Sequence, residues 1–381
     1  MTQEKFNPEL EPENKNLPIG VGKEFFDKRK ETELPVAEIK NSVSWVNPAF
    51  KEVPFKLAEG QPAKLGLFFT TGNSEKKLSI APEYRTGRSG MIDPVIFRDT
   101  EGRLYRDVDL KGIGAFRRDE PTNEHRDDTF MVVPPEILQD DQYQNAANTY
   151  ELGIVGLGYA INDRDRAEEL LKNGIRTYRI VAFIDLEEII DKDGNKVSIE
   201  EAKNRKLMRK NTKPVIEVRA FTTRERIDYL STQRAKEDRI QLALEDARML
   251  VAQELGVNPS EFLISDYTKW FAETLGKQLA QLEKLGLYHG YLHSQNITLD
   301  CKIIDLDSVK ETQEFDKFAE DFSDTLSSFS QLLKAIYKNE SDVERHIALF
   351  RSTHSNELLQ KLPQKFNLQK LKNLFRTITQ N

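Results

Sequence analysis

The residues whose types and spacing could do chemistry lie in one stretch, residues 285–309. A polar run from His289 to Asn296 is followed there by two short apolar runs, 297–299 and 303–304, with a turn between them. This pattern predicts a loop that leads into a tight β-hairpin.

Two side chains at the ends of this predicted hairpin have the chemistry of a metal site. Asn296 stands where the chain enters the hairpin, and Asp305 stands where the chain leaves it. Because the two arms lie side by side, we expect the amide oxygen and the carboxylate to converge, and Mg²⁺ on a phosphate chain prefers such oxygen ligands. We therefore predict that Asn296 and Asp305 bind magnesium, while Asp307 is either a second carboxylate ligand or an inert side chain.

The polar run itself reads His289-Gly290-Tyr291-Leu292-His293-Ser294-Gln295-Asn296. It resembles the catalytic loop of the protein-kinase-like fold, in which His-x-Asp-x-x-x-x-Asn is followed by a hairpin and a metal-binding Asp. Tyr291 occupies the position of the usual base, and a phenol with an ordinary pKa of about 10 is a poor base at neutral pH. In such a loop His289 is expected to brace the backbone.

One branch of that fold, the SelO-type (YdiU-like) protein adenylyltransferases, also lacks the acid at this position and carries a loop of the form His-Gly-x-x-Asn-x-Asp-Asn. The loop of this chain is similar to that branch, although Gln295 stands where the family has the Asp that accepts a proton. The resemblance implies that Gln295 and His293 are the catalytic positions, with a base near one of them; the alternative for His293 is an ordinary hydrogen-bonded loop histidine. Which group is the base stays open.

The first half of the chain has the pattern of a β-rich lobe. Short β-forming runs between Gly and Pro residues predict strands at 77–81, 91–97 and 104–110. A glycine-bearing turn at 84–90 joins the first two strands, and Lys111 ends the third. This order resembles the amino lobe of the kinase fold, where the N–H groups of a glycine loop and one Lys bind phosphates.

The resemblance assigns nucleotide-binding roles in this lobe to Gly87, Arg88, Gly90 and Lys111. Lys111 opens the run Lys-Gly-Ile-Gly, which is similar to the Gln-Leu-Lys-Gly-x-Gly of the SelO family.

Three more residues complete the predicted nucleotide site. A helix is predicted from Asp163 to Leu171 with Asn173-Gly174 as its stop, and the resemblance implies that its Glu168 pairs with Lys111, the alternative being an ordinary surface carboxylate. Arg219 and Arg226 resemble the pair of Arg residues that SelO proteins use on the nucleotide, and guanidinium groups suit phosphates because their charged fork is bidentate. The alternative is that both lie on an exposed strand edge.

Composition limits the class of protein. The chain has 381 residues with 31% charged and 38% hydrophobic residues, which is an ordinary globular balance. The net charge of −7 argues against a dedicated nucleic-acid binder. No apolar stretch reaches roughly 18 residues and the N-terminus lacks an apolar signal core, so we expect no membrane association and a cytoplasmic location. The single Cys301 forbids an intramolecular disulfide.

These observations predict an α+β protein with the two-lobed, protein-kinase-like fold. We expect an N-terminal arm at 1–50, a β-rich nucleotide-binding lobe at 51–227 and a helical lobe at 228–381. In the helical lobe the pattern predicts helices at 228–255, 261–285, 316–338 and 341–377, the first two ended by Gly256 and Gly286.

The function that the resemblance implies is binding of ATP and Mg²⁺ and transfer of AMP to a hydroxyl of a protein substrate. Two alternatives stay open. The loop also resembles small-molecule phosphotransferases of the aminoglycoside-kinase type, apart from Tyr291. The missing acids at 291 and 295 also suit a pseudokinase that binds nucleotide or a partner without turnover.

Overall fold

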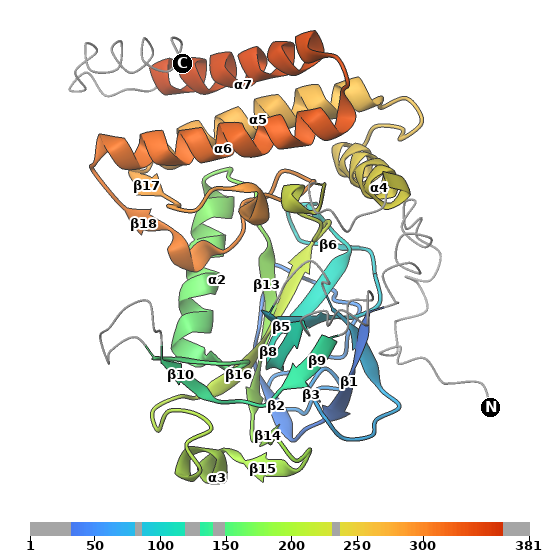
Figure 1. Ribbon diagram of the computed structural model, residues 1–381, viewed down its shortest axis with the longest axis vertical. Coiled ribbons are helices and arrows are strands. Elements are labelled where there is room, and N and C mark those ends of the chain that lie inside the picture. The colour runs from blue at the N-terminus through green and yellow to red at the C-terminus, as the bar shows by residue number, and fades with distance from the viewer. Residues whose placement is uncertain (1–31, 81–85, 119–129, 140–148, 231–236, 361–381) are drawn as a thin grey trace, which may run out of the picture.

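The computed structural model describes residues 32–80, 86–118, 130–139, 149–230 and 237–360. The N-terminal part is built on a large antiparallel sheet and the C-terminal part on long α-helices (Figure 1). The predicted α+β class, with strands first and helices after them, is therefore confirmed. None of the described helices is both long enough and apolar enough to cross a membrane.

The large sheet has the strand order β2-β13-β16-β8-β5-β4-β1-β3, and β12 and β9 pair with β16 and β8. Its strands are β1 (Glu33–Glu38), β2 (Asn41–Val46), β3 (Leu67–Phe69), β4 (Lys77–Ser79), β5 (Thr86–Met91), β8 (Asp107–Arg118), β9 (Phe130–Val133), β12 (Val155–Gly156), β13 (Arg179–Leu186) and β16 (Pro214–Phe221). Smaller elements are the hairpins β6 (Phe97–Arg98) with β7 (Leu104–Tyr105), β10 (Ile137–Gln139) with β11 (Thr149–Glu151), and β14 (Glu188–Ile190) with β15 (Lys196–Ser198), and helix α3 (Ile199–Asn204).

The central strands are buried on both faces. All eight residues of β16 are buried, and alternate residues face two different cores. Ile216 and Val218 join the core formed within the sheet part, whereas Val215 and Phe221 join the core shared with the helices. Such a strand needs an almost continuous apolar sequence, so the charged residues within β16 must find partners inside the protein.

Helix α2 (Leu157–Lys172) lies along β13 and β16 (Figure 1). It begins six residues before the predicted start at Asp163. The N-cap is Gly156, which has no side chain to accept a hydrogen bond, so the sequence carries no cap signal there. The end was predicted correctly, because Asn173 is the C-cap and Gly174 has a φ of +76°.

Two other predictions in this part were wrong. The predicted arm at 1–50 contains β1 and β2, which pair inside the sheet; residues 1–31 lie outside the described chain. The predicted glycine turn at 84–90 is a strand from Thr86 onward, while 84 and 85 also lie outside the described residues. Gly87 serves packing there, because a Cβ at this position would lie 2.2 Å from Cζ of Phe116.

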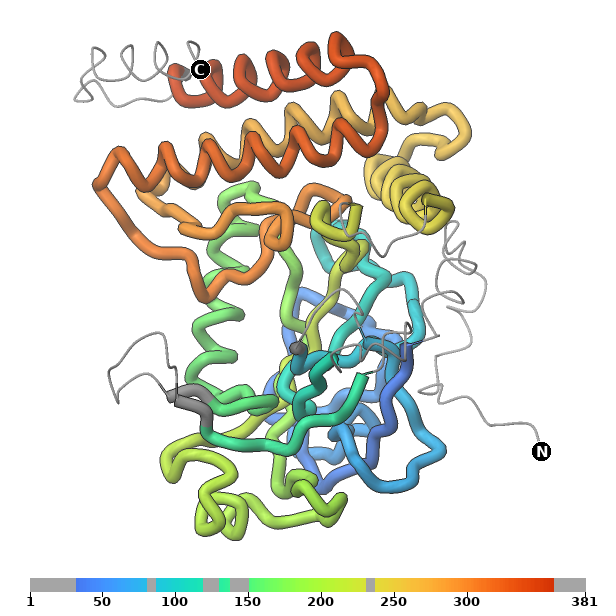
Figure 2. Tube along the Cα trace, in the orientation of Figure 1, coloured from blue at the N-terminus to red at the C-terminus, as the bar shows by residue number. Residues whose placement is uncertain are grey.

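The helical part contains α4 (Glu237–Leu255), α5 (Ile264–Lys284), α6 (Phe315–Ile336) and α7 (Glu340–Gln360). Figure 2 shows α5, α6 and α7 running side by side at the end of the molecule away from the sheet. Gly256 and Gly286, with φ of +70° and +69°, follow α4 and α5 as predicted. The predicted helix at 228–255 is replaced at its start by a short 3₁₀ turn, η2 (Ile227–Leu230), and residues 361–377 of the last predicted helix lie outside the described chain.

Buried ion pairs join the two parts. Arg106, which is fully buried just before β8, donates from Nη1 to Asp246 of α4 at 2.7 Å and from Nε to Asp107 at 2.9 Å. Arg176 makes two hydrogen bonds of 2.9 and 2.8 Å with the carboxylate of Glu254, near the end of α4. The sheet is therefore fixed to α4 by charge pairs as well as by apolar packing.

Candidate functional site

Lys111 is held inside the sheet part by three side chains. Its Nζ lies 3.3 Å from Oδ2 of Asp163 on α2, 3.4 Å from Oε2 of Glu217 on β16 and 3.3 Å from the hydroxyl of Tyr159 on α2. The residue is 5% exposed. Burial alone would lower the pKa of Lys111, but the carboxylates of Glu217 and Asp163 raise it above its ordinary value. Lys111 is therefore a permanent buried cation.

The backbone bends immediately after Lys111. Ser89 of β5 pairs with Lys111, but Gly87 pairs with Phe116, so the register shifts across the intervening residues of β8. Gly112 has a φ of +95°, and a Cβ there would lie 2.7 Å from the carbonyl oxygen of Val215. The Lys-Gly-x-Gly run thus has a backbone reason: it lets the strand bulge where the Lys side chain turns toward α2.

The predicted pairing of Glu168 with Lys111 is wrong. Glu168 instead accepts hydrogen bonds of 2.8 and 2.6 Å from Arg179 and one of 2.9 Å from Asn47. Asp163 and Glu168 are five residues apart, which separates their side chains by about 140° around the helix. Because the helix begins earlier than predicted, Asp163 is an inner residue of α2 that faces the sheet, and it supplies the carboxylate for Lys111.

The two predicted phosphate-binding arginines hold the protein together instead of lying open. Arg219 binds the carboxylate of Asp109 through two hydrogen bonds of 2.7 Å and donates to Oγ of Ser89 at 3.3 Å. Burial would lower the pKa of Arg219, but the negative charge of Asp109 raises it well above the ordinary value. Arg226 donates from Nη1 to the carbonyl oxygen of Gln295 at 2.7 Å, so it orients the predicted catalytic loop.

His289 braces the loop, as predicted. It is fully buried, and its Nε2 lies 2.8 Å from the carbonyl oxygen of Ile304, on the other side of the predicted hairpin. Burial lowers the pKa of His289, so the ring is neutral near pH 7. The backbone N–H groups of His289 and Gly290 both donate to the carboxylate of Asp321 on α6, at 2.5 and 2.8 Å. The sequence reasoning missed Asp321, whose signal is a carboxylate next to Phe322 on the buried stripe of that helix.

Asn296 and Asp305 flank one short backbone ladder. Ile297 and Ile303 form an isolated antiparallel bridge, and the N–H of Ile304 donates to the carbonyl oxygen of Asn296 at 3.0 Å. The paired part of the two arms is shorter than in the predicted hairpin, because Ile297 and Ile303 form an isolated bridge, and Cys301 in the turn adopts a φ of +60°. The two predicted metal ligands are nevertheless brought to adjacent backbone positions.

The donor set around Asn296 and Asp305 fits a metal ion that arrives with phosphates. The amide nitrogen of Asn296 donates to the carbonyl of Tyr291 at 2.8 Å, which fixes the orientation of its amide oxygen. Asp305 is exposed and has a φ of +66°. Within the described residues no group of three or more His, Cys, Asp or Glu side chains is placed to hold a metal. Mg²⁺ is commonly held by one or two protein oxygens together with substrate phosphates, and this set suits that mode.

The predicted catalytic positions are tied into the loop by hydrogen bonds. His293 caps η3 (Ser294–Asn296), and its Nδ1 accepts the N–H of Gln295 at 3.3 Å. The Nδ1 atom of His293 is therefore engaged by the backbone of its own loop. The nearby carboxylate is Asp228 of η2, which accepts from Oγ of Ser294 at 3.4 Å and from Nε2 of Gln295 at 3.5 Å. Sequence spacing gave no sign of Asp228, because it lies 67 residues before Gln295.

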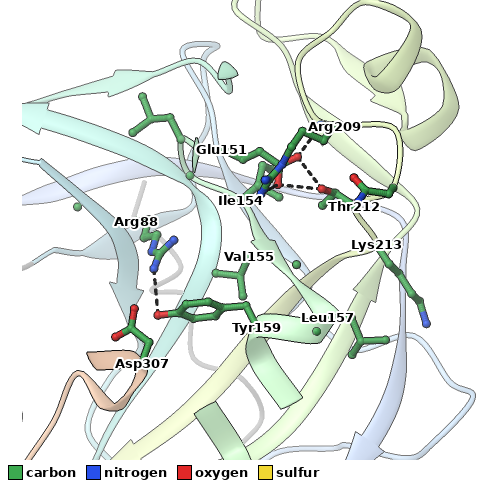
Figure 3. Close-up of a pocket in the computed structure, with 16 residues that line it drawn as sticks. Arg88, Glu151, Ile154, Val155, Leu157, Tyr159, Arg209, Thr212, Lys213 and Asp307 are labelled. Carbon is green, nitrogen blue, oxygen red and sulfur yellow. Dashed lines mark hydrogen bonds and ion pairs between the residues drawn. The ribbon is translucent and has the colours of Figure 1, made fainter. Parts of the chain in front are cut away.

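A cavity of about 880 Å³ joins several of these elements (Figure 3). Gly87 and Arg88 of β5, Tyr159 of α2, and Asp307 of η4 (Leu306–Ser308) line it, and Arg88 lies 3.5 Å from the Tyr159 hydroxyl through Nη2. Gly90 does not line it, since a Cβ there would meet Leu78 and Ile113 inside the sheet core.

The farther wall of the cavity is closed by its own pairs. Glu151 accepts from Arg209 and Thr212, and these three side chains are drawn together in Figure 3. Lys213, which also lines the cavity, pairs with Asp185. The opposite wall carries Arg88, the phenol of Tyr159 and the carboxylate of Asp307, two residues after Asp305.

Compared with protein-family models and with curated proteins, the chain matches none.

Proposed function

We propose that this protein has the two-lobed, protein-kinase-like fold, binds ATP with Mg²⁺ between its lobes, and transfers AMP to a hydroxyl of a protein substrate. One observation carries the proposal: Tyr159 and Asp307 line the same cavity. The hydroxyl of Tyr159 contacts Lys111, and Asp307 lies two residues after Asp305. A buried strand Lys paired with a helix carboxylate, facing a loop that carries an Asn and an Asp, is the set of parts that phosphate chemistry on this fold uses.

The residues of this site divide into three roles. Lys111 and Arg88 supply positive charge for phosphate oxygens. Asn296 and Asp305 would hold the metal ion, which when bound neutralises charge on the phosphates. His289, Arg226 and Asp321 fix the loop that carries Asn296, through the contacts described above.

The proton acceptor that we propose is Asp228. Gln295 cannot accept a proton as a carboxylate does, and its amide donates toward Asp228. The acceptor hydroxyl would bond through its oxygen to the α-phosphorus of ATP, pyrophosphate would leave, and the hydroxyl proton would pass to the Asp228 carboxylate. The carboxylate that SelO-type proteins carry in the loop would here come from η2.

A second candidate function is a nucleotide-binding scaffold without turnover. The observation that favours it is that Arg219 is engaged by Asp109 in a buried pair, so one of the two predicted phosphate-binding arginines is already neutralised. Phosphoryl transfer is a third candidate, which the same experiment separates.

The test is incubation of the full chain and a mixture of candidate acceptor proteins with Mg²⁺ and ATP labelled at the α or the γ phosphate. Label retained on protein from the α position alone supports AMP transfer, and Asp228→Asn should lower it at least tenfold. Label from the γ position alone means phosphoryl transfer. Saturable nucleotide binding with neither label indicates a scaffold, and the absence of Mg²⁺-dependent nucleotide binding would overturn the proposal.

A further inference from the structure

Tyr159 lies between Lys111 and the cavity. Its hydroxyl is 3.3 Å from Nζ of Lys111, and its ring centroid is 4.6 Å from the same atom. Tyr159 lines the cavity, whereas Lys111 is 5% exposed and is not among the lining residues. A ligand in the cavity therefore meets the phenol before it can meet the ammonium group.

The same phenol also engages the second cation of the site. Nη2 of Arg88 lies 3.5 Å from the Tyr159 hydroxyl, and the guanidinium carbon lies 5.4 Å from the ring centroid (Figure 3). One neutral oxygen thus receives hydrogen bonds from two cations. Burial raises the pKa of Tyr159 to about 12 although both cations act to lower it, so the phenol stays neutral at physiological pH.

An ammonium and a guanidinium group donate stronger hydrogen bonds to the oxygen of an anion than to the oxygen of a neutral phenol. Charge-assisted hydrogen bonds to phosphate are roughly twice as strong as those to a neutral acceptor. The phenol oxygen therefore occupies a position that a phosphate oxygen would fill more favourably.

The start of α2 is openly packed around two glycines that precede Tyr159 in the sequence. Tyr159 lies in the first turn, next to Gly158 and three residues after Gly156. A Cβ on Gly158 would have no atom within 4 Å, and one on Gly156 would approach only Thr212, at 3.8 Å. The cavity adjoins this turn, so a change of side-chain rotamer could move the ring without moving the helix.

We propose that Tyr159 is a gate over Lys111, which a phosphate chain displaces in order to bind Lys111 and Arg88 together. This inference rests on the proposed function for the identity of the ligand, but the gate itself requires only a phosphate chain. Displacement of the phenol costs binding free energy, because the hydroxyl must leave both cations. Removal of the ring should therefore tighten phosphate binding.

The experiment measures binding of inorganic tripolyphosphate, Mg²⁺-ATP and adenosine by calorimetry to the wild type, Tyr159→Phe and Tyr159→Ala. Tyr337→Phe is the matched control, since it removes a hydroxyl that lies 2.8 Å from Oγ1 of Thr268 and away from the cavity. We expect Tyr159→Ala to bind tripolyphosphate about tenfold more tightly than the wild type. Tyr159→Phe, which keeps the ring, should gain a few-fold, and Tyr337→Phe should match the wild type.

A second readout follows the ring itself. With 3-fluorotyrosine incorporated at position 159, the fluorine resonance should shift when tripolyphosphate or ATP is added and should not shift with adenosine. This measurement uses the complete chain with a nearly isosteric side chain, so it holds even if Tyr159→Ala folds poorly.

The outcomes separate the gate from the proposed function. Equal or weaker tripolyphosphate binding by both Tyr159 variants, or a fluorine signal that ignores bound phosphate, overturns the gate. Absence of tripolyphosphate binding in every protein also overturns it. If Tyr159→Ala binds tripolyphosphate more tightly but no variant binds ATP, the gate is supported and the proposed function is overturned. If all variants bind ATP equally and the ring does not move, the gate alone is overturned.

Discussion

Nζ of Lys111 lies 3.3 Å from the carboxylate of Asp163, which belongs to the same helix as Glu168 but to a different face. Asp163 is buried and also accepts a hydrogen bond from the hydroxyl of Tyr178, while Glu168 reaches Arg179 at the other side of the helix. The two carboxylates of α2 therefore have separate tasks, and a matched pair of substitutions distinguishes them.

Asp163→Asn should lower nucleotide affinity more than Glu168→Gln. The first change removes a negative charge that holds the Lys111 ammonium in place, so we expect at least a tenfold weaker affinity for Mg²⁺-ATP. The second change affects the hydrogen bonds of Glu168 with Arg179 and Asn47, away from Lys111, so affinity should stay within about twofold and stability should fall by about 1 kcal/mol. Calorimetric titration and urea unfolding of both variants measure the two effects. A larger loss of affinity in Glu168→Gln would restore Glu168 as the partner of Lys111.

The metal prediction follows from the two-residue donor set. Because Asn296 and Asp305 supply only two side chains, Mg²⁺ alone should leave the thermal unfolding midpoint nearly unchanged, and Mg²⁺ with ATP should raise it. Asp305→Asn keeps a residue that tolerates the left-handed backbone at φ +66° but loses the charge. We expect this variant to bind ATP with little dependence on Mg²⁺. Thermal unfolding with ATP, with and without a chelator, tests the point, and an unchanged Mg²⁺ dependence would exclude Asp305 as a ligand.

The buried pair between Arg106 and Asp246 gives a stability prediction that is independent of function. Arg106→Met leaves the carboxylates of Asp107 and Asp246 in the interior without the guanidinium group, which should cost about 3 to 5 kcal/mol. Arg345→Met is the matched control, because Arg345 pairs with Asp342 on the surface of α7 and its side chain is 67% exposed; its effect should stay within about 0.5 kcal/mol. Urea unfolding of both proteins decides between a structural charge pair and a dispensable one.

Features that depend on local sequence could be predicted, and features that depend on distant partners could not. The ends of α2, α4 and α5 follow from Gly174, Gly256 and Gly286, because a positive φ after a helix is a local signal. The place of β2 in the sheet depends on its pairing with β13, about 140 residues away. An isolated short run there has no local pattern that separates it from an arm.

The residues of the site also separate into those that the sequence predicted and those that only the fold shows. His289, Asn296 and Asp305 stand at recognisable spacings, and the backbone brings them together. Asp228 and Asp321 reach the same loop from other elements, so only the fold shows them. The choice of Glu168 failed because the start of α2 carries no cap signal, and an error in the start of a helix changes which face each residue occupies.

Asp321 gives a prediction about pH. Its carboxylate accepts the N–H groups of His289 and Gly290, and burial raises its pKa to about 6 despite these bonds, which favour the ionised form. The unfolded chain has a pKa of roughly 3.9 at this residue. Since the folded protein binds the proton more tightly, the stability due to protonated Asp321 is full below about pH 4 and is lost as the pH rises to about 6.

Asp321→Asn has no proton to lose at this position. The unfolding free energy of the wild type minus that of the variant should therefore fall as the pH rises from 4 to 6.5. The expected change is on the order of 2 kcal/mol. Urea unfolding of both proteins at half-unit pH intervals measures it, and Asp316→Asn in the exposed first turn of the same helix is the control for a change in net charge. A difference that grows with pH would mean that the two N–H bonds outweigh burial, and that the loop around His289 is held by an ionised carboxylate.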